Sequence, residues 1–535
     1  MNKPIETAAV ALAAFLLSTV PGLASDPASC TTETVASRAG PVCGTLVTTS
    51  SGKQAKAFLG IPFAESTAGP GRWKGPTPKE AWTATLPAVK AGVACPQSAP
   101  MTPNQSEDCL NLNVWKPAGA TADAKLPVIV FIYGGAFVAG DAAYGLYDGA
   151  NMAANRDVIL VSFNYRVGVL GFLATSELSG NYGFMDQQAA LTWVKDNIAA
   201  WGGDPAKVTI FGESAGAMSV GLHLFSAPAS APLFRAAIME SNFFGLPYKR
   251  LAQQVDVGNI FKQGLGCVDL KCLQNTDVND LLRAQAAFTP AMSNVFSGTS
   301  FYIPFGPAID GTLLTRQPID GAADGADTKP VLLGTNRNEG VLFVRSEQMS
   351  TAGYASRVAS LFGRSFEKVL SRYPRRDDGN NGSSWAAVQG QALVVCSTRH
   401  VAAKAKTAYL YAFNKEPSFA VWGGPACQRD GNVCHGAELP FVFGNADKIG
   451  GRFTADEAEV SSRVMGYWTN FAAHLDPNGP SPVAAAPRWP RFGEPAKDYL
   501  MLDAPTIAVQ SDPYRDTCEF WDGIGYKIID PWPAR

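Results

Sequence analysis

Charged residues are scarce in this chain, where they make up 17% of 535 residues. Soluble proteins ordinarily carry roughly a quarter. The formal net charge is −2, and neither a run of basic residues nor an Arg/Lys stripe occurs. The sequence therefore argues against nucleic acid and anionic membrane surfaces as partners. Sparse charge together with 46% apolar residues fits a large buried core and an apolar substrate cleft.

Long apolar runs are missing apart from one near the N-terminus. Residues 8–20 are apolar, and the small residues Gly22 and Ala24 follow them. This pattern is typical of a signal peptide cleaved next to Ala24, and the stretch is too short to span a bilayer. We therefore expect residues 1–25 to be a signal peptide, and the protein to be secreted or periplasmic.

Cys-x-x-Cys pairs are also missing, although the chain has ten cysteines. Zinc and thioredoxin-like sites are therefore poorly supported. In an exported chain, an even number of cysteines suggests disulfides. The sequence alone leaves their connectivity open. Short spacings suggest four pairs, and a fifth remains: Cys30–Cys43, Cys95–Cys109, Cys267–Cys272, Cys427–Cys434 and Cys396–Cys518.

Short apolar runs typical of buried strands alternate with helical patterns along the chain, which predicts a large, mostly parallel sheet with helices on both faces. Two further segments, 251–300 and 347–402, are helical and loop-rich, and we expect them to be insertions that form a cleft. We expect residues 26–535 to be one domain, although the length rule alone would suggest about three. The expected strands are 126–133, 158–164, 208–211, 234–239, 330–334 and 408–413, and the expected helices are 187–199, 215–224 and 455–471.

The motif Gly-x-Ser-x-Gly occurs at residues 212–216, with Ser214 at its centre. An apolar strand pattern precedes it and a helix of small residues follows it. This order is required for a nucleophile elbow, in which a serine stands at a strained turn between strand and helix. The start of the helix then directs its amides and the positive end of its dipole at a reacting carbonyl. The sequence therefore predicts Ser214 as a nucleophile.

A glycine-containing loop follows the expected strand 126–133. Its residues Gly135 and Ala136 are candidate amide donors for the oxyanion of a tetrahedral intermediate, with the amide of Ala215 as the third donor. An ordinary turn at the end of the strand is the alternative interpretation.

The chain has only four histidines, which limits the candidates for a general base. His435 lies in a glycine-containing loop well after Ser214. In hydrolases with a nucleophile elbow, the catalytic residues follow one another along the chain in the order serine, acid, histidine. His223 follows the serine on the same expected helix and leaves little room for an acid between them. His400 and His474 lie on or near the ends of expected helices. We therefore predict His435 as the base.

The acid that orients the base should follow a later strand. Glu339 lies just past the expected strand 330–334, and Asp310 is a rival whose flanking proline and glycine suggest a structural turn. In the predicted mechanism His435 takes the Ser214 proton, Glu339 holds the imidazole, and an acyl-enzyme forms and is hydrolysed.

Several long motifs follow one another along the chain, at residues 106–115, 133–137, 164–173, 183–216, 307–311, 334–340 and 435–444. Together they resemble the type-B carboxylesterase/lipase family, which includes cholinesterases and bile-salt-activated lipases, and point to a secreted, bacterial-type member. The resemblance implies an α/β-hydrolase fold and hydrolysis of carboxylic esters by a Ser–Glu–His triad, without a metal or organic cofactor. It also implies three of the disulfides: Cys95–Cys109, Cys267–Cys272 and Cys396–Cys518.

This chain departs from the family pattern in three places. Ala136 stands where the family usually has a third glycine, although an alanine amide can still donate. The segment 95–109 contains no tryptophan, and cholinesterases use a tryptophan there to bind a quaternary ammonium by cation–π contact. We therefore expect choline esters not to be preferred substrates. The Cys427–Cys434 pair is an extra feature, and we hypothesise that it stiffens the loop that carries His435.

Four aromatic residues near family cleft positions are predicted to line the acyl pocket, with core packing as the alternative: Phe301, Tyr302, Phe305 and Trp422. The sequence does not select among four classes of ester substrate: short-chain esters, acylglycerols, aromatic or phenolic esters, and polyester fragments. A binding protein on the same scaffold and a peptidase with the same triad are competing functions. All three triad residues are retained, which favours the enzyme over the binding protein, and the resemblance over most of the chain favours esters over peptides.

Overall fold

The computed structural model describes residues 30–526, except 100–101, 296–302, 326–328, 345–348, 377–378, 380, 423–426, 428–430, 481–482, 484–485 and 494–495. The predicted signal peptide, residues 1–25, lies outside the described residues.

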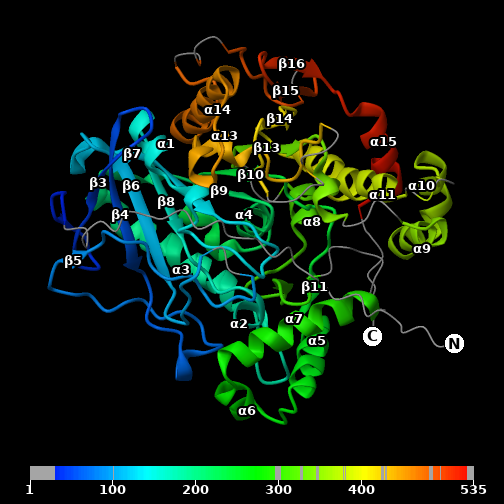
Figure 1. The fold of residues 1–535 in the computed structure, drawn as a ribbon, viewed down its shortest axis with the longest axis horizontal. Helices are drawn as coiled ribbons and strands as arrows, with labels where there is room; N and C mark the ends of the chain where they lie inside the picture. The colour runs from blue at the N-terminus through cyan, green and yellow to red at the C-terminus, as the bar shows by residue number, and fades with distance from the viewer. Residues whose placement is uncertain are drawn as a thin grey trace.

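A mixed sheet of eleven strands forms the centre of the protein (Figure 1). The seven strands in the middle of the sheet run parallel to one another, and the pairs toward both edges are antiparallel. The expectation of a large, mostly parallel sheet is therefore confirmed. In spatial order the strands are β16 (Ala508–Ser511), β15 (Asp498–Leu502), β14 (Ala408–Phe413), β13 (Val331–Asn336), β10 (Ala236–Glu240), β9 (Gly203–Glu213), β7 (Leu126–Ile132), β8 (Ile159–Phe163), β6 (Asn111–Pro117), β4 (Gln54–Pro62) and β3 (Thr45–Thr48).

The central strands have apolar residues at successive positions because both of their faces are covered. All residues of β8, β10, β13 and β14 are buried, as expected for parallel strands between two layers of helices. The antiparallel edge strands were not predicted from the sequence. The strand β16 is exposed throughout, and in β6 the buried polar residues Asn111 and Asn113 interrupt the apolar run.

Helices cover both faces of the sheet. The helices α3 (Tyr182–Asn197) and α4 (Ala215–Phe225) pack on one face, and α1 (Ala150–Asn155) and α14 (Ala455–His474) pack on the other (Figure 1). Both α4 and α14 contact β7 and β9, so these two strands lie between the helices. The predicted helix at 187–199 begins earlier, at Tyr182, after Asn181 in a left-handed turn.

The two segments predicted as insertions are helical. The first holds α5 (Leu251–Gly264), α6 (Leu270–Asn275) and α7 (Val278–Val295), and the second holds α9 (Thr351–Phe362), α10 (Phe366–Arg372), α11 (Gly382–Gln389) and α12 (Cys396–Ala402). The second packs with α15 (Arg515–Ile524) around a core of its own that includes Trp385 and Trp521. The remaining helices are α2 (Gly168–Phe172), α8 (Pro318–Ala323) and α13 (Leu439–Phe443). None of the helices in the described part of the chain has the length and apolarity needed to cross a bilayer.

Candidate active site

Neighbouring parallel strands end at the same edge of the sheet, and the candidate residues follow these ends. Ser214 follows β9, Gly135 and Ala136 follow β7, and Glu339 follows β13. The strand β10 lies between β9 and β13, and Ser241 follows it. The carboxyl edge of a parallel sheet is where open α/β proteins gather their reactive groups.

The backbone turns sharply at Ser214, between the end of β9 at Glu213 and the start of α4 at Ala215. Ser214 has φ +57° and ψ −124°, a conformation that side chains rarely adopt and that costs about 1–3 kcal/mol. A Cβ added at Gly216 would lie 1.9 Å from the carbonyl oxygen of Ile132, so strand and helix can approach only because this residue is glycine. The structure thus has the strained strand–turn–helix geometry of a nucleophile elbow.

The imidazole of His435 is buried and bonded to the carboxylate of Glu339. The Nδ1 atom of His435 lies 2.6 Å from Oε2 of Glu339. The other oxygen of Glu339, Oε1, accepts hydrogen bonds from the Ser241 hydroxyl at 2.6 Å and from the main-chain N–H of Asn336 at 2.7 Å. These bonds hold the carboxylate in place, and its contact with Nδ1 favours the tautomer that leaves Nε2 as a proton acceptor.

The Nε2 atom of His435 faces the nucleophile elbow. It lies 3.1 Å from Oε1 of Glu213, the residue before Ser214. This contact is close enough for an ion pair but is not a hydrogen bond, because neither atom has a hydrogen-bond partner within the described residues. The rings of Phe243 and Phe343 pack against the imidazole, with centroids 5.3 and 5.0 Å from its own. The imidazole is therefore held between two carboxylates and two phenyl rings.

Burial and charge shift the pKa values of these groups in a coupled way. Burial lowers the pKa of His435, but the charges of Glu213 and Glu339 outweigh it and raise the pKa to about 9. Burial raises the pKa of Glu213 to about 7 against the attraction of His435, and the charge of Glu339 adds to the rise. Because the two groups lie 3.1 Å apart, they titrate as a pair.

Two further buried carboxyl groups lie behind this pair. The side-chain amide of Asn336 donates to Glu438 at 2.5 Å, and the Trp468 indole donates to Glu240 at 2.5 Å. Burial raises the pKa of Glu438 to about 8 and that of Glu240 well above its usual range. Burial thus favours the neutral form of both carboxyl groups.

The sequence analysis did not identify Glu213, Ser241, Glu240 and Glu438 as site residues. A signal was present for each of them. Glu213 is the variable residue before the motif serine, and Glu438 follows His435 by three positions. Glu240 and Ser241 lie at the carboxyl end of β10, the strand between those that precede Ser214 and Glu339. The order of the strands, which the sequence does not state, makes this position significant.

The loop after β7 presents backbone amides beside the elbow. Gly135 has φ +108° and Ala136 has φ +54°, and among the described residues no hydrogen bond uses the amide of either as a donor. A Cβ added at the preceding residue, Gly134, would lie 2.9 Å from the Cβ of Ser214. The third candidate donor, Ala215, is the first residue of α4, where amides have no partner within the helix.

The four predicted pocket residues differ in their surroundings. Phe301 and Tyr302 lie outside the described residues. Phe305 is fully buried, and its ring packs against Phe261 and Phe288, with centroids 5.0 and 5.7 Å away. This is the core packing named above as the alternative for that residue.

The fourth residue, Trp422, is partly buried next to His435. Its indole N–H donates to the main-chain oxygen of His435 at 2.7 Å.

All ten cysteines form disulfides in the structure. The five pairs are Cys30–Cys43, Cys95–Cys109, Cys267–Cys272, Cys396–Cys518 and Cys427–Cys434. The last pair directly precedes His435.

The rival candidates have structural partners. His223 is buried between Ser230 and Gln187, and His400 lies 3.2 Å from Asp522. The Asp310 carboxylate accepts hydrogen bonds within its own turn, from Thr312 and Leu314. His474 is the last residue of α14. Among the described residues, no group of three His, Cys, Asp or Glu side chains is arranged to hold a metal ion.

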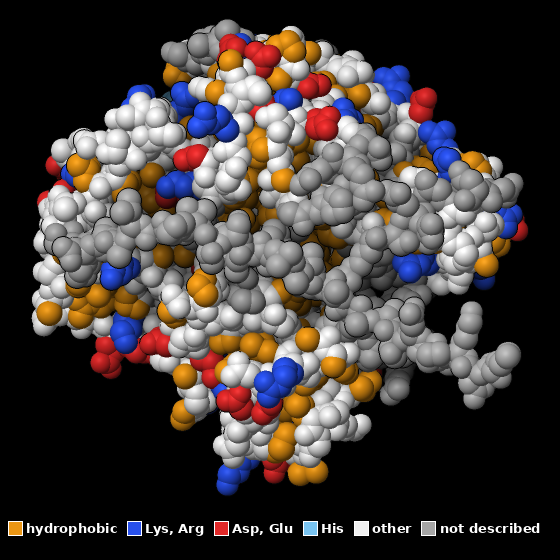
Figure 2. Space-filling model, viewed as in Figure 1, with side chains coloured by type: hydrophobic (Ala, Val, Ile, Leu, Met, Phe, Trp, Pro, Cys, Tyr) orange, Lys and Arg blue, Asp and Glu red, His pale blue; other side chains and the backbone are white. Residues whose placement is uncertain are grey.

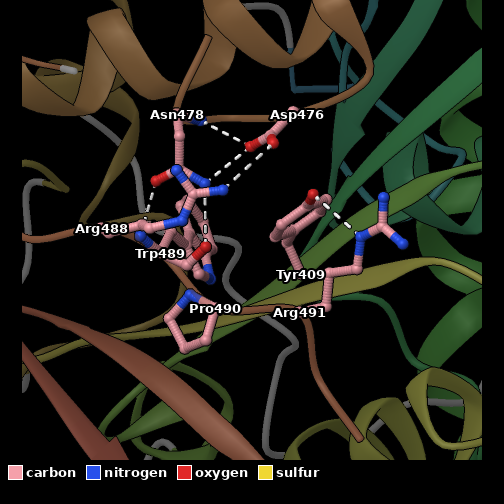
Figure 3. Close-up of a pocket in the computed structure, with 7 residues that line it drawn as sticks. All are labelled: Tyr409, Asp476, Asn478, Arg488, Trp489, Pro490 and Arg491. Carbon is pink, nitrogen blue, oxygen red and sulfur yellow. Dashed lines mark hydrogen bonds and ion pairs between the residues drawn. The ribbon is translucent and has the colours of Figure 1, made fainter. Parts of the chain in front are cut away.

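A separate pocket of about 270 Å³ lies next to Tyr409, near the amino end of β14 and thus away from the edge that carries the candidate residues. Its polar groups bond one another: Asn478 exchanges hydrogen bonds with the backbone of Trp489 and donates to Asp476 (Figure 3). The protein face shown in Figure 2 has acidic and basic side chains interspersed, without an extended patch of one sign.

Comparisons with known proteins agree with this geometry. A model of the carboxylesterase family matches residues 31–521. The chain is 34% identical to para-nitrobenzyl esterase of Bacillus subtilis (strain 168), over 85% of this chain and 92% of the relative. It is 33% identical to acetylcholinesterase of Electrophorus electricus, over 93% of this chain and 89% of the relative.

Solved structures agree as well. A PNB esterase superposes with a TM-score of 0.78 at 34% identity, covering 91% of this chain and 99% of that one. A thermophilic PNB esterase superposes with a TM-score of 0.79 at 33% identity, with the same coverage. The fold class expected from the sequence is confirmed. The chain belongs to the carboxylesterase family and is a carboxylic ester hydrolase with the α/β-hydrolase fold.

Proposed function

We propose that this enzyme hydrolyses esters through an acyl-enzyme intermediate, with Ser214 as nucleophile, His435 as general base and Glu339 as the orienting acid. The observation that carries the proposal is the position of the His435 imidazole. Its Nδ1 lies 2.6 Å from Glu339, and its Nε2 faces the residue next to the strained Ser214. A base held at one nitrogen by a carboxylate, with its other nitrogen at the nucleophile elbow, is the arrangement expected to activate a serine hydroxyl.

In the proposed acylation step, Nε2 of His435 removes the Ser214 proton while Oγ attacks the ester carbonyl carbon. The resulting imidazolium is stabilised by Glu339 and Glu213, on either side of the ring. It then gives its proton to the leaving alcohol as the carbon–oxygen bond breaks. Water, deprotonated by the same nitrogen, attacks the acyl-enzyme, and the carboxylic acid leaves as Ser214 regains its proton.

The developing negative charge on the carbonyl oxygen needs donors that are already in place. We propose the amides of Gly135, Ala136 and Ala215 for this role. Two observations support this role. The amides of Gly135 and Ala136 donate to no acceptor among the described residues, and Ala215 is the first residue of α4. Preorganised donors of this kind contribute about 3–4 kcal/mol each to transition-state stabilisation.

We propose neutral esters with an apolar or aromatic group as the substrate class. Phe243 and Phe343 give the base an apolar surrounding, and one relative is named para-nitrobenzyl esterase. The segment 95–109 has no tryptophan to hold a quaternary ammonium group. The enzyme should therefore prefer benzyl and phenyl esters to choline esters.

We also propose that the protein is exported, with residues 1–25 removed. The support is its five disulfides, because disulfides persist in oxidising compartments. N-terminal sequencing of protein recovered from culture medium or periplasm tests this. A mature N-terminus that retains residues 1–25 would contradict it.

A fluorophosphonate probe tests the catalytic roles. The wild type should be labelled and should hydrolyse para-nitrobenzyl acetate, and Ser214→Ala and His435→Ala should lose both properties. A matched control is Ser219→Ala, since Ser219 lies on the same helix and donates to the Ala215 carbonyl at 2.9 Å. The proposal is wrong if Ser214→Ala is labelled or hydrolyses the ester as the wild type does. Equal efficiency with acetylthiocholine would refute the substrate preference alone.

A further inference from the structure

We propose that Trp422 is a positioning residue, which holds the main chain of His435 so that the imidazole stays aligned with Glu339 and the elbow. The proposal rests on the proposed role of His435 as the base. It assigns Trp422 a role different from the pocket-lining role expected from the sequence.

The contacts of Trp422 are with the backbone of the base and its neighbour. The indole N–H donates to the His435 carbonyl oxygen at 2.7 Å. The ring also lies against Gly436, where an added Cβ would be 2.7 Å from the indole. Gly436 has φ +75°, a left-handed conformation that glycine adopts without strain. The indole therefore contacts the chain at the point where it turns after the base.

The backbone before His435 is anchored by a different set of contacts. Val433 and Asn338 exchange two hydrogen bonds, of 2.9 and 3.0 Å, and Cys434 is bonded to Cys427. Asn338 directly precedes Glu339, so this side of the base is joined to the segment that carries the acid. Trp422 supplies an anchor on the following side. His435 is thus held from both directions along the chain.

Alignment matters here because His435 makes two short contacts in opposite directions. The distances are 2.6 Å from Nδ1 to Glu339 and 3.1 Å from Nε2 to Glu213. A rotation of the peptide between His435 and Gly436 would move the imidazole away from one or both carboxylates. Displacements of about 1 Å in a catalytic group can lower rates by about a hundredfold. Loss of the two contacts would also remove the charges that favour the imidazolium form.

The test is Trp422→Phe, which removes the indole N–H and keeps an aromatic ring over Gly436. The matched control is Trp82→Phe. The Trp82 indole donates to the Pro41 carbonyl at 3.0 Å, and an added Cβ at Gly40 would lie 2.4 Å from it. This partly buried tryptophan has the same kind of contacts, and its partner Pro41 belongs to β2 (Pro41–Cys43) in a separate three-stranded sheet. The two variants lose equivalent hydrogen bonds in different places.

With para-nitrobenzyl acetate as substrate, Trp422→Phe should lower kcat by about 3- to 10-fold, the effect of one hydrogen bond, and leave KM unchanged. The acid limb of its pH–kcat/KM profile should move to lower pH, by about half a unit or more. Trp82→Phe should match the wild type in kcat, KM and pH profile. If Trp422→Phe does not fold, benzothienylalanine at position 422 keeps the ring shape and replaces the N–H by sulfur.

Two results would overturn the proposal. One is a folded Trp422 variant with the kcat and pH profile of the wild type. The other is a raised KM with unchanged kcat, which would make Trp422 a pocket residue. Measuring His435→Ala alongside separates this proposal from the assignment of His435 as the general base, on which it rests. If that variant stays active, the assignment of the base is wrong, whereas an inactive His435→Ala with an unaffected Trp422→Phe refutes only the positioning role.

Discussion

Replacing Glu213 by Gln removes one of the two negative charges that flank the base. Oε1 of Glu213, the residue before Ser214, lies 3.1 Å from Nε2 of His435. Glutamine has nearly the same shape, so the change is mainly one of charge. Burial lowers the His435 pKa, but the charge of Glu213, followed by the charge and hydrogen bond of Glu339, raises it to about 9.

The size of the effect follows from this distance. Two full charges 3.1 Å apart attract each other by about 5 kcal/mol at an effective dielectric constant of about 20. This is an upper limit, because burial raises the pKa of Glu213 to about 7 and the carboxyl is partly protonated where the base titrates. Opposite charges at this range shift pKa values by about 1–3 units. We expect Glu213→Gln to lower the apparent pKa of the base by about 1–2 units.

The base must be neutral to accept a proton, so kcat/KM rises as pH rises through its pKa. In the wild type this rise should occur above the usual histidine pKa of about 6.5. In Glu213→Gln it should move to lower pH, and the plateau should fall by about tenfold or more, because the imidazolium formed in the transition state loses a stabilising charge.

The assay is kcat/KM for para-nitrobenzyl acetate at closely spaced pH values. Glu177→Gln is a suitable control, because Glu177 is a surface carboxylate paired with Lys262. An acid limb at the same pH in the wild type and in folded Glu213→Gln would refute the reasoning. So would a wild-type profile that is flat across the range from roughly pH 5 to 9.

Three further outcomes are expected. Ser241→Ala removes a buried donor 2.6 Å from Glu339 and should lower kcat by about 10- to 100-fold; an unchanged kcat would show that the hydroxyl does not position the acid. Replacing both cysteines of the Cys427–Cys434 disulfide by serine should lower the free energy of unfolding by about 2–3 kcal/mol and should lower kcat as well, so wild-type values in thermal melting and turnover would contradict a stiffening role. Arg166→Met breaks a buried ion pair with Asp186, 2.7 Å long, and should cost about 3–5 kcal/mol of stability, measured by urea unfolding; a loss below about 1 kcal/mol would mean that Asp186 is neutralised another way.

Local patterns explain how much of the fold the sequence predicted. The runs that became β7, β8, β10, β13 and β14 are buried on both faces, so their residues are mostly apolar or small. The polar exceptions, Glu240, Thr335 and Asn336, lie at the carboxyl ends of β10 and β13. The half-exposed or polar edge strands have no such run, and β3, β4, β6, β15 and β16 were missed. Their pairing depends on contacts between segments far apart in the sequence, and patterns among neighbouring residues carry no information on such contacts.

The elbow at Ser214 is also a local feature, since a serine between two glycines at the junction of strand and helix is visible in five consecutive residues. The sequence by itself thus determined the strand–helix alternation, the elbow and the residue types of the proposed triad. The tertiary structure alone decided that Nε2 of His435 faces Glu213, that Ser241 holds Glu339 and that Trp422 bonds the backbone of the base. Each of these contacts joins residues that are tens to hundreds of positions apart, except Trp422 and His435, where a disulfide-closed loop intervenes. Distances and orientations between such residues depend on how strands are ordered in the sheet, and strand order is set by the packing of the whole chain.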